Sequence, residues 1–229
     1  MGDSSVGELS AEDIRMNLSN NLVVNCSVHQ VSSSIASGVN SIGNVYGGAF
    51  SVNIGHYCFA GDGTSVVGST VVRNTFLTTS GNTLINCSAL IATTGDGVFS
   101  NGANVYGGGI SLQLGAYSYS GGSSKVSGST ALSSSVHNIT DNTLINCSAL
   151  SSTVGAPSSF SNGANVFGGG VSLQIGAYSY SSNSSIVYGS TAVSDTSNII
   201  AGNALSSCKS LTTMFGGASN GASAFGGGI

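Results

Sequence analysis

Short runs along the chain alternate between apolar and polar residues. One run reads ISLQL over residues 110–114, and a related run reads VSLQI over residues 171–175. A period of two is typical of a β-strand with one buried face. Val, Ile and Thr are frequent, and Gly, Asn and Ser separate the runs, which favours strands joined by turns. The sequence therefore predicts an all-β protein.

These runs belong to a repeat of about sixty residues. The segments NNLVVNCSV, GNTLINCSA, DNTLINCSA and GNALSSCKS contain cysteines that are 61, 60 and 61 residues apart, namely Cys26, Cys87, Cys147 and Cys208. Two further motifs follow. One is GGG or GGA, which starts at Gly47, Gly107, Gly168 and Gly226. The other is GST, which starts at Gly68, Gly128 and Gly189.

One marker from each motif divides the chain into shorter repeats of 18 to 22 residues. We interpret each as one coil, which predicts a right-handed parallel β-helix, a solenoid of about eleven coils grouped in sixty-residue units. Each strand would pair with its copy about 4.8 Å away. Residues 17–229 are expected to form this single domain, open at the C-terminal end. Residues 1–16 are expected to be an acidic N-terminal arm or cap, with a short helix starting at Ser10 and Asp13.

The glycine and NCS motifs resemble the repeats of the polymorphic outer membrane proteins, a chlamydial autotransporter family in which GGAI and FxxN motifs recur along a β-helical passenger. The matching segments are GGAF, GGGI, GGGV and GGGI, and they extend over nearly the whole chain. Leu84 and Leu144 stand where the family has Phe. The resemblance implies surface display and adhesion without specifying a ligand.

Composition narrows the function classes. Only 5% of the residues are charged and the formal net charge is −4. Arg73, Lys125 and Lys209 are far apart in the repeat, so no basic stripe for nucleic acid is expected. No stretch approaches about eighteen consecutive apolar residues, and no signal peptide is recognised, so membrane insertion is not expected. A surface of Ser, Thr and Asn suits an extracellular or cell-surface protein, and a glycoprotein.

Cysteine and histidine residues do not have the spacing of a metal or disulfide site. With three coils between them, neighbouring repeat cysteines would be about 14 Å apart, whereas a disulfide needs Cα atoms within about 7 Å. We expect these cysteines to be buried and unbonded. The histidines occupy different repeat positions, so no metal is expected: His29, His56 and His137.

Carboxylates are equally scattered in the repeat body, at Asp62, Asp96, Asp141 and Asp195. Polysaccharide lyases and glycosidases, which often adopt this fold, need clustered carboxylates or a basic residue on one face. We therefore expect no catalytic residues, no cofactor and no enzyme activity. A carbohydrate-active β-helix stays open as an alternative, because geometry does not exclude a pair of Asp residues.

Aromatic pairs recur once in each unit, as Tyr57 with Phe59, Tyr117 with Tyr119, and Tyr178 with Tyr180. Members of a pair share a strand face, and copies would be three coils apart. They either cover the edge of the core or form a contact surface for glycans or a partner chain. The five tyrosines are our candidate contact residues.

Six N-x-S/T sequons start at Asn17, Asn25, Asn86, Asn138, Asn146 and Asn183, about as many as chance gives for 21 Asn. We expect Asn25, Asn86 and Asn146 to act in turns or ladders. Asn138 and Asn183 look like loop residues and are the candidates for N-glycosylation. The GST motifs suggest an ice-binding face less strongly, because such a face needs Thr on every coil.

A non-enzymatic structural or adhesive surface protein is the function that these features favour. The chain would be a filament subunit or a fragment of a longer chain, with its open ends contacting a further copy or further repeats. The alternative is a carbohydrate-binding or carbohydrate-active β-helix.

Overall fold

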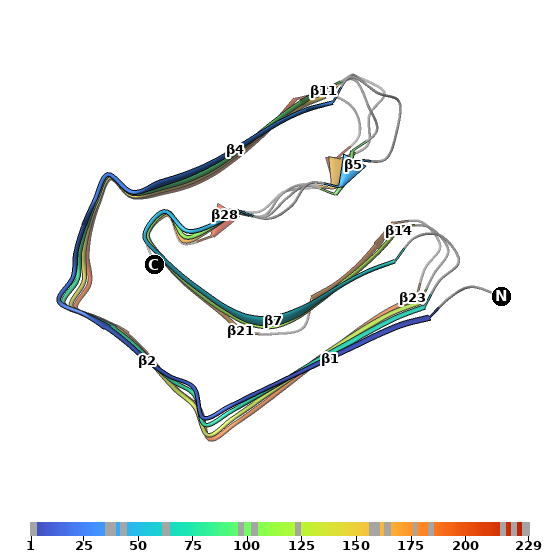
Figure 1. Cartoon of the computed structure of the whole chain (residues 1–229), viewed down its shortest axis with the longest axis horizontal. Helices are drawn as coiled ribbons and strands as arrows, with labels where there is room; N and C mark the ends of the chain where they lie inside the picture. Colours follow the sequence, from blue (N-terminus) through green and yellow to red (C-terminus); the bar gives the residue numbers. More distant parts are fainter. Residues whose placement is uncertain are drawn as a thin grey trace.

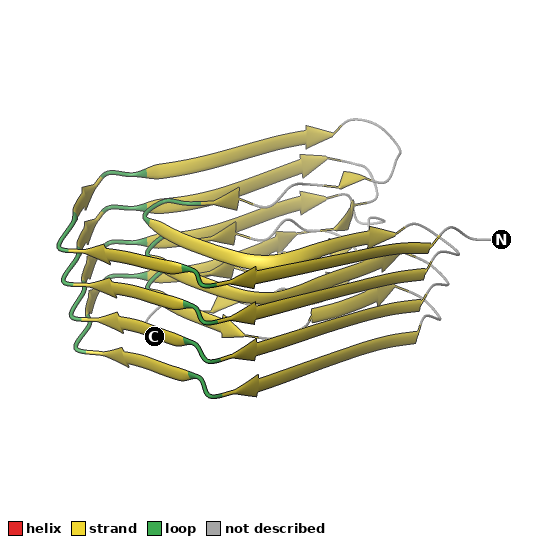
Figure 2. Cartoon of the chain, turned by 60° about the horizontal axis from the view of Figure 1, so that its bottom comes forward, coloured by secondary structure: helices red, strands yellow, loops and turns green. Residues whose placement is uncertain are grey.

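A computed structural model describes residues 4–34, 40–41, 45–60, 65–95, 99–101, 105–121, 125–155, 161–162, 166–175, 178–182, 186–215, 219–220 and 224–225. Within these ranges the chain forms strands and turns, and none of the residues is helical. All strand pairs are parallel, and the copies of each strand stack on one another (Figure 2). The expected all-β parallel stack is confirmed.

Five four-stranded sheets take one strand from each sixty-residue unit and are named here by their first strand. The β1 sheet contains β1 (Ser4–Glu12), β8 (Ser65–Arg73), β15 (Lys125–Ser133) and β23 (Ile186–Ser194). The β2 sheet contains β2 (Arg15–Ser19), β9 (Phe76–Ser80), β16 (Val136–Thr140) and β24 (Ser197–Ala201). The β3 sheet contains β3 (Leu22–Val24), β10 (Thr83–Ile85), β17 (Thr143–Ile145) and β25 (Ala204–Ser206).

The remaining sheets follow along the unit. The β4 sheet contains β4 (Ser27–Ser34), β11 (Ser88–Gly95), β18 (Ser148–Gly155) and β26 (Lys209–Phe215). The β6 sheet contains β6 (Val45–Tyr46), β13 (Val105–Tyr106), β20 (Val166–Phe167) and β28 (Ala224–Phe225). The β7 sheet contains β7 (Phe50–Ala60), β14 (Ile110–Gly121), β21 (Val171–Ile175) and β22 (Tyr178–Ser182). Two short pairs join β5 (Asn40–Ser41) to β12 (Phe99–Asn101) and β19 (Ser161–Asn162) to β27 (Ser219–Asn220).

The pairing register shows that one sixty-residue unit makes one full turn of the chain, which we call a rung. Val66 pairs with Ser5 on one side and with Val126 on the other. No described strand pairs with a strand about twenty residues away in the sequence. The expected coil of 18–22 residues, and with it the count of about eleven coils, is therefore wrong. Four rungs stack in the sheets that are continuous through the chain.

The prediction of a twenty-residue coil was wrong because consecutive apolar runs in the sequence pack against each other across the core instead of pairing edge to edge. Each rung folds inward, so that the β7 sheet lies between the β1 sheet and the β4 sheet (Figure 1). The β7 and β1 sheets contact each other through β7 with β8 and β14 with β15. The glycine and GST motifs thus occupy two different positions in one rung.

The glycine motif allows the inward fold to reach the far wall of the rung. Gly108, just before β14, lies so close to the start of β18 that a Cβ atom on it would overlap the Ser148 carbonyl group. Gly169 meets Lys209 in the same way one rung later. A residue without a side chain is therefore required where two backbones come together at this point.

Three corners turn the chain between the β1, β2, β3 and β4 sheets, and each uses a left-handed residue. The positive-φ positions form columns through the rungs: Asp13, Asn74, Ser134 and Asp195; Asn20, Gly81, Asp141 and Gly202; Asn25, Asn86, Asn146 and Ser207. Asn, Asp and Gly tolerate this conformation at the least cost, which explains their regular spacing in the sequence. The turn role expected for Asn25, Asn86 and Asn146 is confirmed.

Apolar side chains fill two regions inside each rung. The larger cluster includes Leu77, Leu84, Leu112 and Leu144, each at most 1% exposed. The smaller cluster lies between the β4 and β6 sheets and contains Ala89, Ile91, Val105, Ala149 and Val166. Because every rung supplies the same positions, both clusters run along the stack.

The expected N-terminal arm or cap over residues 1–16 does not match the structure where this segment is described. Residues 4–12 form β1, which pairs with β8 over its whole length, and β2 begins at Arg15. The expected short helix starting at Ser10 and Asp13 is wrong, because these residues belong to the end of β1 and the turn before β2. Leu9 and Ala11 face the core, so this segment carries the alternation of a rung rather than a helical face.

Candidate functional site

Columns of stacked side chains are the features of this fold that concentrate chemistry. The four repeat cysteines form one such column, at the corner between the β3 and β4 sheets. The residues flanking them pair in register, Ile85 with Val24 and Ser88 with Ser27. The expected separation of three coils is wrong, because neighbouring cysteines are one rung or about 4.8 Å apart. The four cysteines of this column are free.

Exposure of these thiols depends on the position of the rung. Cys87 and Cys147 are fully buried, Cys208 is half-buried and Cys26 is exposed. The Cys87 sulfur lies 3.7 Å from the Val23 carbonyl oxygen, and the Cys147 sulfur lies 3.6 Å from that of Leu84. Each inner thiol therefore lies against a carbonyl group of the preceding rung, and the Cys87 sulfur also lies 3.5 Å from the Ile85 carbonyl oxygen of its own rung.

Contact within the column changes the thiol acidities. Burial raises the pKa of the Cys87 thiol. A hydrogen bond to the Cys208 sulfur, together with burial, raises the pKa of the Cys147 thiol, and the same contact lowers the pKa of Cys208. Because the thiolate is the reactive form, the two inner cysteines are poor nucleophiles.

A buried asparagine ladder follows the corner between the β2 and β3 sheets. Asn82 and Asn142 are 1% and 0% exposed. The Nδ2 group of Asn82 donates to Asn142 Oδ1 at 2.8 Å and to the Leu18 carbonyl at 2.7 Å. Asn21 and Asn203 continue the same pattern on the outer rungs. The side chains thus satisfy backbone groups that the corner leaves without strand partners.

A second asparagine ladder lies on the surface at the next corner. Asn86 donates to Asn25 Oδ1 at 3.1 Å, and Asn146 donates to Asn86 Oδ1 at 3.3 Å. The ladder role expected for these three residues is confirmed. Since the Nδ2 groups of Asn86 and Asn146 are engaged, these sequons have a structural use.

The two candidate glycosylation residues have different outcomes. Asn138 lies inside β16 and is half-buried, with its Oδ1 atom buried and without a hydrogen-bond partner. The expectation that it occupies a loop is wrong, because β16 pairs on both sides at this residue. Asn183 lies outside the described residues.

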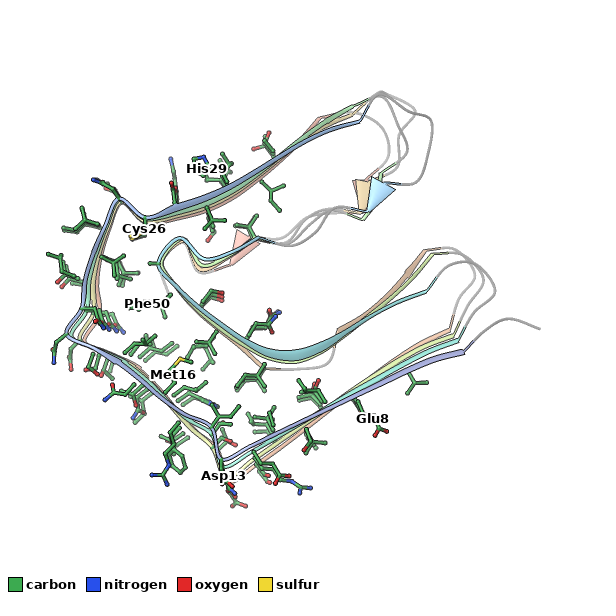
Figure 3. All side chains as sticks on the ribbon, viewed as in Figure 1. Glu8, Asp13, Met16, Cys26, His29 and Phe50 are labelled. Atoms are coloured by element: carbon green, nitrogen blue, oxygen red, sulfur yellow. The ribbon has the colours of Figure 1, made fainter. Side chains whose placement is uncertain are left out.

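His137 is a buried polar residue in the column that contains Leu77. Its ring contacts Thr75 Oγ1 at 3.2 Å and Asn198 Oδ1 at 2.7 Å. Burial lowers the pKa of His137, and the Asn198 contact offsets this in part. His29 is exposed and points away from the stack (Figure 3), while the side chain of His56 lies outside the described part. Among the described residues no group of three or more side chains could hold a metal ion.

The aromatic pairs form two columns on neighbouring rungs of the β7 sheet. Tyr117 pairs with Tyr57 and with Tyr178. Tyr119 pairs with Phe59 and with Tyr180. The expected separation of three coils is wrong, and aromatic positions recur at the rung spacing of about 4.8 Å. These pairings describe the backbone alone, because the side chains of these residues are outside the described part.

Four of the remaining candidate residues have defined places. Thr70 and Thr130 of the GST motifs are only 1% and 2% exposed, so these two side chains do not contribute to an exposed face. Asp141 and Asp195 are exposed residues at two different corners of neighbouring rungs. Asp62 and Asp96 lie outside the described residues.

Side-chain columns that are closed in the middle of the stack are open at its two outer rungs. Val72 and Leu132 are 0% and 1% exposed, but Val193, next in the same column, is 50% exposed. Met16 points inward (Figure 3) and is 37% exposed, whereas Leu77 beside it is 1% exposed. The sequence alone could not identify these residues, because which residues stack in one column depends on the rung register.

Comparisons with protein-family models, with curated proteins and with solved structures gave no match. No helix in the described part is long and apolar enough to cross a membrane. The resemblance to the polymorphic outer membrane proteins therefore stays a prediction.

Proposed function

We propose that the chain is a non-enzymatic structural or adhesive repeat protein, built as a right-handed parallel β-helix. Hydrogen-bonded and apolar columns that continue from rung to rung are the observation that supports this proposal most. In Figure 1 the chain winds clockwise as it moves away from the viewer, which favours the right-handed form. A stack held together by repeated columns is a suitable rigid spacer.

Residues that could carry chemistry have structural tasks instead. Asn82 and Asn142 satisfy corner backbone, and His137 is hydrogen-bonded inside a core column. The inner cysteines are buried against main-chain carbonyl groups. These roles favour a scaffold over an enzyme.

The family resemblance and the Ser, Thr and Asn composition favour an extracellular or cell-surface location. There the stack would be a filament subunit or part of a longer chain that displays an adhesive face. Adhesion is tested by coating a surface with the purified chain and measuring cell attachment against a heat-unfolded sample. Turnover of an acidic polysaccharide that disappears in Asp141→Asn would overturn the non-enzymatic assignment.

Carbohydrate binding is a second candidate, favoured by the two aromatic columns. Sugar rings stack on aromatic side chains, and positions repeating at the rung spacing would offer several such contacts to an extended glycan. A glycan array is the test. Glycan binding that persists in the Tyr117→Ala and Tyr178→Ala double variant would refute binding by the aromatic columns.

A further inference from the structure

We propose that the two ends of the stack pair with each other in separate copies of the chain, so that strands β23–β26 of one copy join β1–β4 of the next. The partner is a second copy, held in the register that neighbouring rungs use. This inference rests on the proposed structural function and adds a defined interface to it.

The backbone at both ends offers unpaired strand edges. Within the described residues, β1–β4 pair only with β8–β11, and β23–β26 pair only with β15–β18. Both sets run in the same direction along the rung and have the same strand lengths at the β1, β2 and β3 positions. Edges of this kind are templates for pairing with another chain.

The apolar columns also continue across such a junction. Val193 would cover Ala11, and Leu205 would cover Val23, each pair belonging to one column. Leu84 and Leu144, the inner members of the second column, are fully buried, while its outer members are half-buried. A second copy therefore covers both columns at the junction, beside the β7 sheet, to which the fourth unit contributes no described strand.

Hydrogen-bond direction in the buried asparagine ladder matches as well. Asn21 donates through its backbone N–H and its Nδ2 group to Asn82 Oδ1. Asn142 donates to Asn203 Oδ1 by the same two groups. At the junction, the backbone N–H and the Nδ2 group of Asn203 in one copy would donate to Asn21 Oδ1 of the second copy.

The corner between the β2 and β3 sheets has an alternation that the junction preserves. Its column reads Asn20, Gly81, Asp141, Gly202. A Cβ atom on Gly81 would lie 2.5 Å from Asn20 Oδ1, and one on Gly202 would overlap Asp141 Oδ1. A side chain on one rung thus needs a glycine on the next. The four rungs of one copy contain this alternation of side chain and glycine twice and end on a glycine. Gly202 would therefore meet Asn20 of the second copy, and the alternation would continue.

One pair of like charges disfavours the junction. Asp195 and Asp13 occupy the same corner column and are both exposed, so stacking brings the two carboxylates about one rung apart. Their repulsion is screened by salt. Asp195→Asn should therefore tighten end-to-end association by about threefold at low salt. Asp141→Asn, an equal loss of charge at an exposed corner inside the stack, is the matched control.

Crosslinking of native cysteines tests the geometry directly. In the variant Cys58→Ser, Cys87→Ala, Cys147→Ala, the two remaining thiols, Cys26 and Cys208, are three rungs or about 14 Å apart within one chain. They cannot bond in one copy. In stacked copies they become neighbours. Diamide takes two electrons and two protons from the pair, which forms one S–S bond as the diazene becomes a hydrazine.

We expect covalent oligomers on non-reducing gels, a Cys26–Cys208 peptide by mass spectrometry, and loss of both on adding Cys26→Ser. Sedimentation velocity of the unaltered chain covers the case in which the variant does not fold. A chain that stays monomeric at high concentration, or one whose association is the same in Asp195→Asn and in Asp141→Asn, overturns the stacking proposal. Cell attachment by a monomeric chain would leave the proposed function standing.

Discussion

Removing one side chain from the buried asparagine ladder should cost far more at an inner rung than at an outer one. In Asn142→Ala, the acceptor Oδ1 is lost, and it receives both the backbone N–H and the Nδ2 group of Asn82, at 3.1 and 2.8 Å. Two buried donors are then left without these partners. At about 1–3 kcal/mol for each unsatisfied group, the expected loss of unfolding free energy is about 4 kcal/mol.

Asn21→Ala is the matched control, since it makes the same change in the same column. Asn21 is exposed, and its backbone N–H would still donate to Asn82 Oδ1, at 2.9 Å. The expected loss is about 1 kcal/mol. Urea unfolding measures both values. Hydrogen-exchange mass spectrometry of the peptide around Asn82 should show faster exchange in Asn142→Ala only. Equal losses in the two variants would refute the role given to the ladder.

Three further results are expected. Gly108→Ala should destabilise the fold by about 3 kcal/mol or more, because its Cβ would overlap backbone, whereas Gly81→Ala, which meets only a side chain, should cost about 1–2 kcal/mol in the same urea titration. Burial lowers the pKa of His137, so below about pH 6.5 the unfolded chain binds more protons. The folded state should therefore lose stability as the solution is acidified below that pH. In thermal melts from pH 7 to 5, the melting temperature of His137→Leu should decrease less than that of the unaltered chain. A short iodoacetamide pulse should label exposed Cys26 and spare buried Cys87, and equal labelling would contradict the thiol column.

Local features of the fold could be predicted from the sequence because they depend on neighbouring residues. Alternation in ISLQL gives the strand, and Asn86 before Cys87 gives the turn. The sixty-residue repeat gives the parallel stacking of identical segments. Each of these follows from backbone preference or from the pattern of burial.

The length of one turn could not be predicted in the same way. Alternating runs look alike whether they pair edge to edge or pack face to face, and only the contacts across the core distinguish the two. The glycine motif carried the missing signal. Gly108 and Gly169 have no side chain because the backbone of another strand lies against them, which indicates an inward fold rather than a separate coil.

The candidate site changed for the same reason. With a short coil, neighbouring copies of the cysteines and of the tyrosines were expected three coils apart, which is too far for the cysteines to bond. With one rung per unit, Tyr117 lies between Tyr57 and Tyr178, and Cys87 follows Cys26 directly. The sixty-residue spacing of the cysteines and of the tyrosines was recognised in the sequence. The distance between neighbouring copies could be derived from it only once the strand register was known.

Cross-hydrogen-bond scalar couplings measured by solution NMR test the sixty-residue rung most directly. The structure predicts a coupling from the Ser88 amide nitrogen to the Cys26 carbonyl carbon, joined by a 2.8 Å hydrogen bond, and one from Ser148 to Cys87, also at 2.8 Å. Couplings that instead join Ser88 to a carbonyl about twenty residues earlier would contradict one unit per rung, and with it the columns on which the proposed function depends.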